Sequence, residues 1–260
     1  MFQRVEYKKR AWNLLRETYW LSFAVCLVAG LLTGGISYIT SRPAQPNYSR
    51  FVASNLDWGS LFIISGAIII VGLIVFVVSY AYLIFVAYPI QVGKNKFFLE
   101  ARKGNKSFGL LFSSFKENRY LDVVKGMAWM LLFQYLWTLC FIIPGIIKAY
   151  SYSMTPFILA DNPSIGYQRA LKLSMQMTDG YKWNIFVLQL SYIGWYLLGI
   201  LCCGIGTLFV SPYYIASLTE TYAALRKNAM EKGYCTPAEL NLTQGDYYLD
   251  YPQFPGTEKY

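Results

Sequence analysis

The sequence contains no histidine, which limits the chemistry that its side chains can perform. Histidine is the commonest general base, and it completes the Ser-His-Asp triad and most catalytic zinc sites. The chain also has no Walker loop and no dinucleotide-binding glycine motif, and its five cysteines form no CxxC pair. We therefore expect a protein that is not an enzyme and that needs no metal or cofactor.

Two clusters of polar side chains interrupt apolar segments and are the candidates for ligand binding. They are Tyr150, Ser151, Tyr152, Ser153 and Thr155 in the first cluster, and Ser211, Tyr213, Tyr214 and Ser217 in the second. Together they could line a polar cleft for a lipid head group, a peptide or a small solute. Because Ser, Thr and Tyr also hydrogen-bond one membrane helix to another, the sequence leaves helix packing open as the alternative.

Lys125 and Glu220 are ionisable residues that lie within the predicted membrane spans 123–143 and 207–225. Charges within membrane spans are costly, usually paired and often functional. We expect both near the inner ends of their spans, where they could form an ion pair or a gate. Extension of each side chain to the membrane surface is the alternative.

The surrounding sequence is that of an integral membrane protein. Hydrophobic residues make up 55% of the 260 residues and charged residues only 14%, and residues 61–90 contain no charge. A bilayer core about 30 Å thick needs roughly 20 apolar residues of helix, because every backbone amide must be paired inside the segment. The predicted fold is an all-α, polytopic transmembrane bundle.

Six spans, arranged as three hairpins, account for the apolar segments between residues 19 and 226. We predict them at 19–39, 61–88, 123–143, 146–160, 183–203 and 207–225. A five-span alternative keeps the chain outside from Pro144 to Trp183. Six spans leave only Arg42, Arg50 and Lys148 outside, so the preference for positive charge on the cytoplasmic side favours six, with both termini cytoplasmic.

Basic amphipathic segments flank the spans. Residues 1–18 are predicted to form a cytoplasmic surface helix, and similar helices are expected at 108–115 and 164–178, the last capped by Asn162. Residues 227–260 form a polar, aromatic-rich tail that we expect to be flexible. The net charge of +9 follows the span ends and forms no single stripe, which favours anionic lipid head groups and excludes nucleic acid as the partner.

The chain resembles a family of bacterial membrane proteins catalogued as domain of unknown function 975. The resemblance covers residues 108–225 and is carried by IIPGIIKAYSYSMTPFILADNP, SIGYQRALKLSMQMTDGYKW and the GIG and LFVSPY segments, while KKRAWNLLRETYW fits the basic helix before the first span. It implies a multi-pass membrane fold. It brings no activity and no catalytic residues.

Two functional hypotheses follow. The first is a protein of the bacterial cell membrane that binds lipids, other membrane proteins or a second copy of itself through its basic surface helices. The second is a small transporter or exporter. It rests on a weak repeat between residues 141–161 and 202–222, which place a Gly/Pro turn before a polar span in both C-terminal hairpins.

Overall fold

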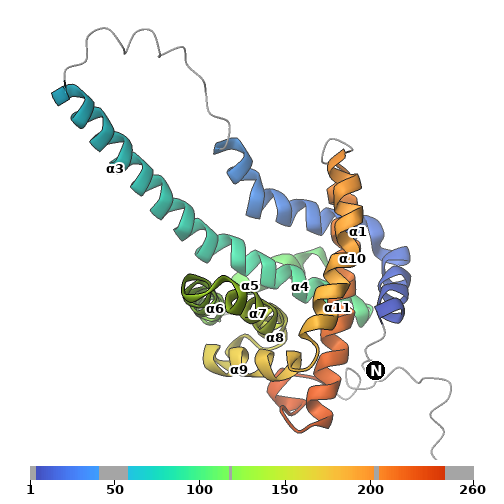
Figure 1. The fold of residues 1–260 in the computed structure, drawn as a ribbon. Helices are drawn as coiled ribbons and strands as arrows, with labels where there is room; N and C mark the ends of the chain where they lie inside the picture. The colour runs from blue at the N-terminus through green and yellow to red at the C-terminus, as the bar shows by residue number, and fades with distance from the viewer. Residues whose placement is uncertain (1–3, 41–57, 117–118, 202–204, 244–260) are drawn as a thin grey trace, which may run out of the picture.

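Helices make up most of the chain in the computed structural model, which describes residues 4–40, 58–116, 119–201 and 205–243 (Figure 1). No β-strand occurs among these residues. The predicted all-α fold class is therefore confirmed. Residues 41–57, which lie between the first two predicted spans, and residues 244–260 of the predicted tail lie outside the described residues.

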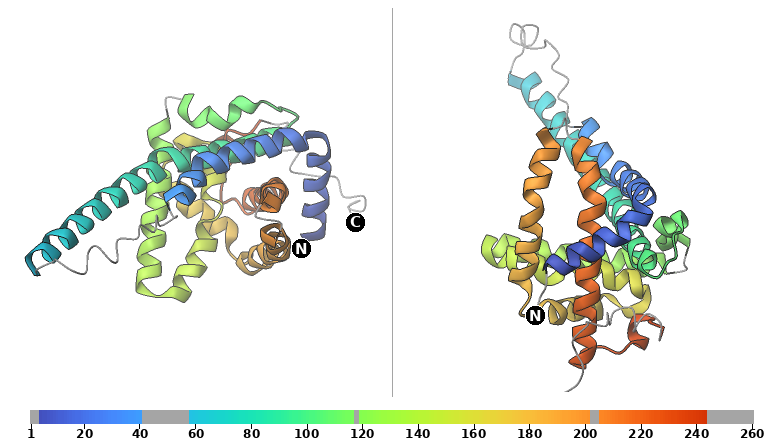
Figure 2. Two further views of the ribbon diagram at one scale, coloured as in Figure 1. Left: turned by 90° about the horizontal axis from the view of Figure 1, so that it is seen from above. Right: turned by 90° about the vertical axis from the view of Figure 1, so that its right-hand side faces the viewer.

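The N-terminal part of the chain consists of two long helical segments. The elements are α1 (Arg4–Thr40), α3 (Trp58–Tyr82), a π-helical segment (Leu83–Ala87) and α4 (Tyr88–Arg102). In α1 the predicted surface helix and the predicted first span are one helix, which bends part of the way along (Figure 2). The predicted second span ends too early at residue 88, because the helix continues through Pro89 to Arg102.

A hydrogen bond from another helix explains how the chain stays helical through Pro89. Proline has no N–H group, so the carbonyl four residues earlier, that of Phe85, loses its normal partner. The Tyr120 hydroxyl donates to this carbonyl instead, at 2.5 Å. The π-helical segment lies at the same point, where the ladder of hydrogen bonds is interrupted.

The middle of the chain folds as short helices around α6. The elements are a 3₁₀ turn (Phe108–Phe112), α5 (Ser113–Lys116), α6 (Tyr120–Cys140), α7 (Ile142–Tyr152), α8 (Thr155–Asp161), a 3₁₀ turn (Pro163–Ile165) and α9 (Tyr167–Thr178). Asn162 accepts a hydrogen bond from the Ser164 N–H, as the predicted cap requires. The α-helix nevertheless begins at Tyr167 and not at Ser164, because Gly166 has a φ of 81°.

The turn between α6 and α7 lies earlier than predicted. Phe141 has extended backbone angles and separates the two helices, whereas Pro144 and Gly145 lie in the first turn of α7. Proline is tolerated there because the first N–H groups of a helix have no partner within the helix. A side chain at Gly145 would place its Cβ 2.7 Å from Thr138 Cα, so glycine is what allows the two helices to approach.

The predicted span 146–160 is not one helix. It breaks at Ser153 and Met154, and α8 begins with Pro156 in its first turn. A continuous helix would lose the hydrogen bond that residue 156 cannot donate and would bring the proline ring against the preceding turn. Residues 155–160 are buried on all sides, so α8 belongs to the protein core.

The C-terminal part is a hairpin of α10 (Lys182–Leu201) and α11 (Ile205–Glu231), followed by a 3₁₀ turn (Ala238–Leu240). The hairpin closes where Gly206 faces Gly199, because a Cβ on Gly206 would lie 2.6 Å from Gly199 Cα. The helix α11 continues six residues beyond the predicted end of its span at 225. The predicted flexible tail therefore includes residues 227–243, which are folded in the structure.

Among the described residues, two clusters of buried apolar side chains form the core, and both include residues of α4 and α11. One cluster joins these helices to α6, α8 and α9. The other joins them to α1 and the Phe108–Phe112 turn, in which Leu111 is fully buried. The segment that we predicted as a surface helix at 108–115 therefore packs onto α4. It consists of a 3₁₀ turn followed by the four-residue helix α5.

Three helical segments are long and apolar enough to cross a membrane among the residues that were described, namely Ser65–Arg102, Tyr120–Cys140 and Lys182–Leu201. The most apolar stretch of the first has no buried residue. The α6–α7 hairpin lies crosswise to the α10–α11 hairpin (Figures 1 and 2), with α9 packed against α6, α7 and α11. The described helices thus form an all-α arrangement in which three segments could span a membrane and these two hairpins are not parallel to each other.

Gly93 provides a direct test of the packing between α4 and the Phe108–Phe112 turn. A Cβ at this position would lie 2.0 Å from the Leu111 carbonyl oxygen, and that backbone is enclosed by the core. We expect Gly93→Ala to lower the free energy of unfolding by about 1–3 kcal/mol, measured by denaturant titration.

Gly66→Ala in α3 is the matched control, because its added methyl group has no heavy atom within 4 Å. It should be neutral, or stabilising by up to about 1 kcal/mol through helix propensity. Equal effects of the two substitutions would contradict the packing.

Candidate functional site

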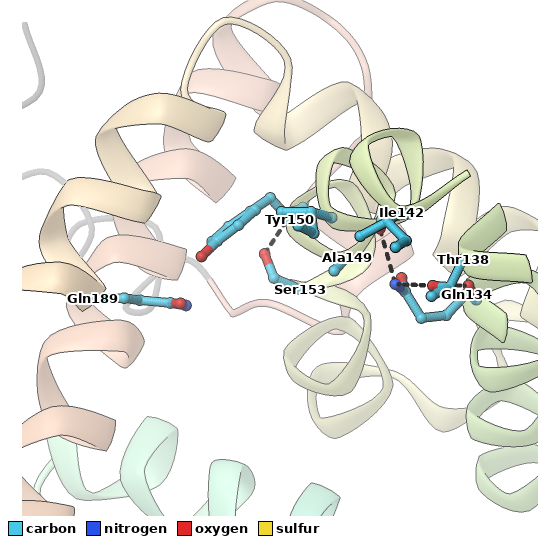
Figure 3. Close-up of a pocket in the computed structure, with 9 residues that line it drawn as sticks. Gln134, Thr138, Ile142, Ala149, Tyr150, Ser153 and Gln189 are labelled. Carbon is cyan, nitrogen blue, oxygen red and sulfur yellow. Dashed lines mark hydrogen bonds between the residues drawn. The ribbon is translucent and has the colours of Figure 1, made fainter. Parts of the chain in front are cut away.

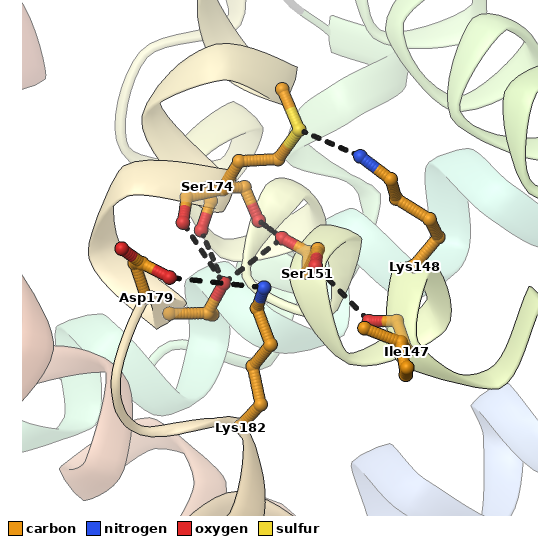
Figure 4. A network of polar contacts seen from close by, with 8 residues as sticks. Ile147, Lys148, Ser151, Ser174, Asp179 and Lys182 are labelled. Atoms are coloured by element: carbon orange, nitrogen blue, oxygen red, sulfur yellow. Dashed lines mark hydrogen bonds and ion pairs between the residues drawn. The ribbon is translucent and has the colours of Figure 1, made fainter. Parts of the chain in front are cut away.

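The break between α7 and α8 leaves the Ser151 carbonyl without a partner in its own helix, and side chains of α9 donate hydrogen bonds to it (Figure 4). The Ser151 carbonyl accepts hydrogen bonds from Ser174 Oγ at 2.8 Å and from Thr178 Oγ1 at 3.3 Å. Ser174 and Thr178 are four residues apart, so they share one face of α9. The last carbonyls of a helix lack partners within it, and here two buried hydroxyl groups donate hydrogen bonds to one of these carbonyls.

The other polar side chains at and near the α7–α8 break make mostly local contacts. Ser153 Oγ donates to the Tyr150 carbonyl at 2.7 Å, and Ser151 Oγ donates to the Ile147 carbonyl at 3.0 Å. Lys148 lies over the Trp137 ring, 4.9 Å from its centroid. Tyr152 and Thr155 are buried, and Thr155 Oγ1 has no hydrogen-bond partner in the described part of the chain.

A cavity of about 310 Å³ lies between α6, α7 and α10 (Figure 3). Tyr150 and Ser153 line it from α7 and Gln189 lines it from α10. Gln134 on α6 donates from Nε2 to the Gly145 carbonyl at 2.9 Å, whereas its Oε1 is buried without a partner among the described residues.

The second predicted cluster lies elsewhere, between α1, α10 and α11. Ser217 is fully buried and hydrogen-bonded to the Tyr192 hydroxyl. The rings of Tyr213 and Tyr214 pack edge-on against Tyr192, with centroids 5.3 and 5.4 Å away. Ser211 is hydrogen-bonded to the Cys26 thiol of α1. The structure therefore divides the predicted cleft residues between two places, and most of them join helices together.

The partner of Glu220 differs from the one that the sequence predicts. Arg102, at the end of α4, binds its carboxylate with Nε–Oε1 at 2.7 Å, and both side chains are largely buried. Lys125 has an exposed side chain on α6 and forms no ion pair with any described residue. The predicted Lys125–Glu220 pair is therefore replaced by Arg102–Glu220, which joins α4 to α11.

A second buried ion pair lies one to two turns further along α11. Arg226 Nη1 is 2.6 Å from Asp161 Oδ2, and the two side chains are 2% and 6% exposed. The Tyr222 hydroxyl donates to the same carboxylate oxygen at 2.7 Å, and the Tyr222 ring stacks on Phe157. This pair fixes the end of α8 to α11, and no local sequence pattern predicts it because its residues are 65 positions apart.

The segment after α11 is bound to α9 by a third pair. The Arg169 guanidinium donates twice to the Glu239 carboxylate, with Nη2–Oε2 at 2.9 Å, and once to the Tyr234 carbonyl at 2.7 Å. These hydrogen bonds lower the pKa of Glu239 below its ordinary value. The pair therefore stabilises the fold at neutral pH, and its contribution is lost as the pH falls through the lowered pKa.

The neighbouring thiol is not arranged for chemistry. Burial raises the pKa of Cys235 to about 11, so it is protonated at neutral pH and a weak nucleophile. No group of three His, Cys, Asp or Glu side chains that could hold a metal occurs among the described residues. The polar arrangement in the described chain is suited to fixing helices and to binding a ligand through hydrogen bonds or charge.

These observations define the class of the protein as an all-helical protein with apolar helices long enough to cross a membrane. Residues 107–229 match the family described as "Protein of unknown function (DUF975)". The matched region extends from the Phe108–Phe112 turn nearly to the end of α11, and it is the region that carries the resemblance in the sequence. Neither a curated protein nor a solved structure matches the chain.

The Asp161–Arg226 pair predicts a large effect on stability. Arg226→Met should lower the free energy of unfolding by about 3–5 kcal/mol, because it leaves a buried carboxylate without its partner. The double variant Asp161→Leu/Arg226→Met should recover part of this loss, because no unpaired charge remains in the core.

The matched control is Lys227→Met on the next residue of α11. Lys227 is 3.9 Å from Glu231, whose side chain is 50% exposed, and such surface pairs contribute about 0–1 kcal/mol. Denaturant titration should show a change within that range. An Arg226→Met variant as stable as the control would contradict a buried ion pair at this position.

Proposed function

We propose that the protein is an integral membrane protein of a bacterial cell membrane. The observation that supports this most strongly is the exposure of large apolar side chains on α3, α6 and α10. Ile74, Leu139 and Leu198 expose 58%, 73% and 58% of their surface, and they are surrounded by other exposed apolar residues. Soluble proteins rarely expose contiguous apolar patches larger than a few hundred Å², so lipid chains are the natural environment of these helices.

Six crossings with both termini in the cytoplasm remain our proposal for the topology, and they require the α6–α7 hairpin to turn from its crosswise position so that it lies along the α10–α11 hairpin. They require α7 together with α8, and the apolar half of α11, to return across the membrane beside α6 and α10. An eleven-residue helix such as α7 is roughly 16 Å long, about half the thickness of the bilayer core. The fourth crossing would therefore be a broken one, in which the buried α8 lies within protein and not in lipid.

The function that we propose is the binding of anionic lipids, or the organisation of partner membrane proteins, at the cytoplasmic surface. Basic side chains on the predicted surface helices support it, because Lys9 and Arg16 on α1, Lys116 on α5 and Lys172 on α9 are all exposed. Each such charge contributes about 1 kcal/mol to attraction by an anionic membrane surface. Other membrane proteins, or a second copy of the chain, are the further partners that we expect.

A small transporter or exporter is the second candidate. One observation favours it, namely the cavity of about 310 Å³ that is lined by Gln134, Tyr150 and Ser153. Membrane transporters often place their substrate site beside a discontinuous helix, and the α7–α8 break lies next to this cavity.

Native mass spectrometry of the purified protein in nonionic detergent tests the proposed function. The protein, incubated with phosphatidylglycerol and phosphatidylcholine in equal amounts, should retain phosphatidylglycerol preferentially. The fourfold variant Lys9→Gln, Arg16→Gln, Lys116→Gln, Lys172→Gln should lose about tenfold or more of this binding, because it removes four exposed charges.

Lys125→Gln is the control, since Lys125 is exposed on α6 and lies outside the surface helices. Equal retention of the two lipids by the unmodified protein would contradict lipid binding through charge. A protein that moves a solute in proteoliposomes, and loses this activity with Gln134→Leu, would favour the transporter.

A further inference from the structure

A second cavity, of about 260 Å³, lies at the end of α4. We call it the basic pocket, and its walls come from four places in the chain: α4, the residue that precedes α6, the α8 end with its 3₁₀ turn, and the segment after α11. Its polar lining residues are Lys96, Glu100, Lys103, Arg119, Asp161 and Asn241. None of them belongs to the cavity between α6, α7 and α10, so this is a separate site.

The two carboxylates of the basic pocket are already bound by cations. Glu100 Oε1 is 2.8 Å from Lys103 Nζ. Asp161 is held by Arg226 at 2.6 Å and by the Tyr222 hydroxyl at 2.7 Å, so its charge is compensated from behind the pocket wall. A carboxylate that is bound in this way repels an incoming anion far less than a free one.

The cations of the lining outnumber these acids. Lys96, Lys103 and Arg119 contribute three positive charges against the two carboxylates, and Arg226 adds a fourth behind Asp161. Arg119 has an exposed side chain, which leaves its planar guanidinium able to bind an oxyanion through two N–H groups. Asn241 provides an amide at the rim and donates to the Asp161 carbonyl at 3.4 Å.

The size and position of the pocket select among anions. A volume of about 260 Å³ is at or below the small end of ligand cavities, and is enough for a phosphate group with a small substituent. The pocket lies at the end of the apolar Ser65–Arg102 segment, where a membrane surface would meet the protein under the proposed topology. Basic pockets in this position bind phosphorylated lipid head groups in other membrane proteins.

We propose that the basic pocket binds a phosphate group through Arg119, while Lys96 and Lys103 add positive charge to its lining. The source of that phosphate is either the head group of an anionic phospholipid or a free phosphate compound. The lipid source rests on the proposed function, whereas the chemistry of the pocket does not depend on it.

Calorimetric titration of the purified full-length protein in nonionic detergent tests this proposal with two probes. One probe is inorganic pyrophosphate, and the other is mixed micelles that contain phosphatidylglycerol, with phosphatidylcholine micelles as the reference. Arg119→Gln removes a charge from the pocket, and Asn241→Asp adds a negative one to its rim. Each should weaken binding about fivefold, the effect of one charge near a phosphate.

Two control variants match these changes. Lys125→Gln removes an exposed charge from α6, outside both the pocket and the basic surface helices. Asn241→Gly keeps the left-handed backbone of residue 241, whose φ is 52°, without adding a charge. Both controls should change affinity for pyrophosphate less than twofold, and all four variants should keep the unfolding midpoint of the unmodified protein.

The possible outcomes separate the pocket from the proposed function. Pocket variants that weaken binding of both probes, with unaffected controls, support a lipid head group in the pocket. Binding of pyrophosphate alone supports the pocket with a free phosphate compound, and it contradicts lipid binding as the function. Lipid binding that the pocket variants leave unchanged, together with no binding of pyrophosphate, overturns the pocket but leaves the surface function intact. If neither probe binds, both proposals fail.

Discussion

The cost of burying a charge without a partner is the constraint on which the rest of this structure depends. Arg226 is almost completely inaccessible to solvent, and an isolated guanidinium could not remain there in its charged form at an acceptable cost. Asp161 supplies its partner, and Arg102 does the same for Glu220. Because these partners come from α8 and α4, the pairs fix both helices to α11 and thereby the geometry of the basic pocket, whose walls include α4 and the end of α8.

This constraint divides the molecule along α11. The half that carries Glu220 and Arg226 packs among α4, α8 and α9, where charges are paired and backbone carbonyls are capped by Ser174 and Thr178. The other half runs beside α10, whose end exposes Leu198 and Leu201. Lipid around the apolar half and a basic surface at the polar half would suit a protein that works at the membrane surface, which is the function that we propose.

Helices could be predicted from this sequence because local signals specify them. Uncharged runs and the Asn162 cap depend on neighbouring residues alone, and these features agree with the structure. The break at Ser153 follows from Pro156, but the continuation through Pro89 depends on a hydroxyl from Tyr120, which no local pattern contains. The ion pairs of α11 join residues 65 and 118 positions apart, so one sequence gives no means of pairing Glu220 with Arg102 rather than Lys125.

Spin-label accessibility measured in proteoliposomes tests the central claim, that α3, α6 and α10 are embedded in lipid, most directly. Single labels would replace Ile74, Leu136 and Leu198, with Lys172 on α9 as the reference, in a variant whose five native cysteines are alanine. We expect collisions with oxygen to dominate at the first three positions and collisions with a water-soluble nickel complex to dominate at residue 172. Access of the nickel complex to all four labels would contradict the membrane assignment.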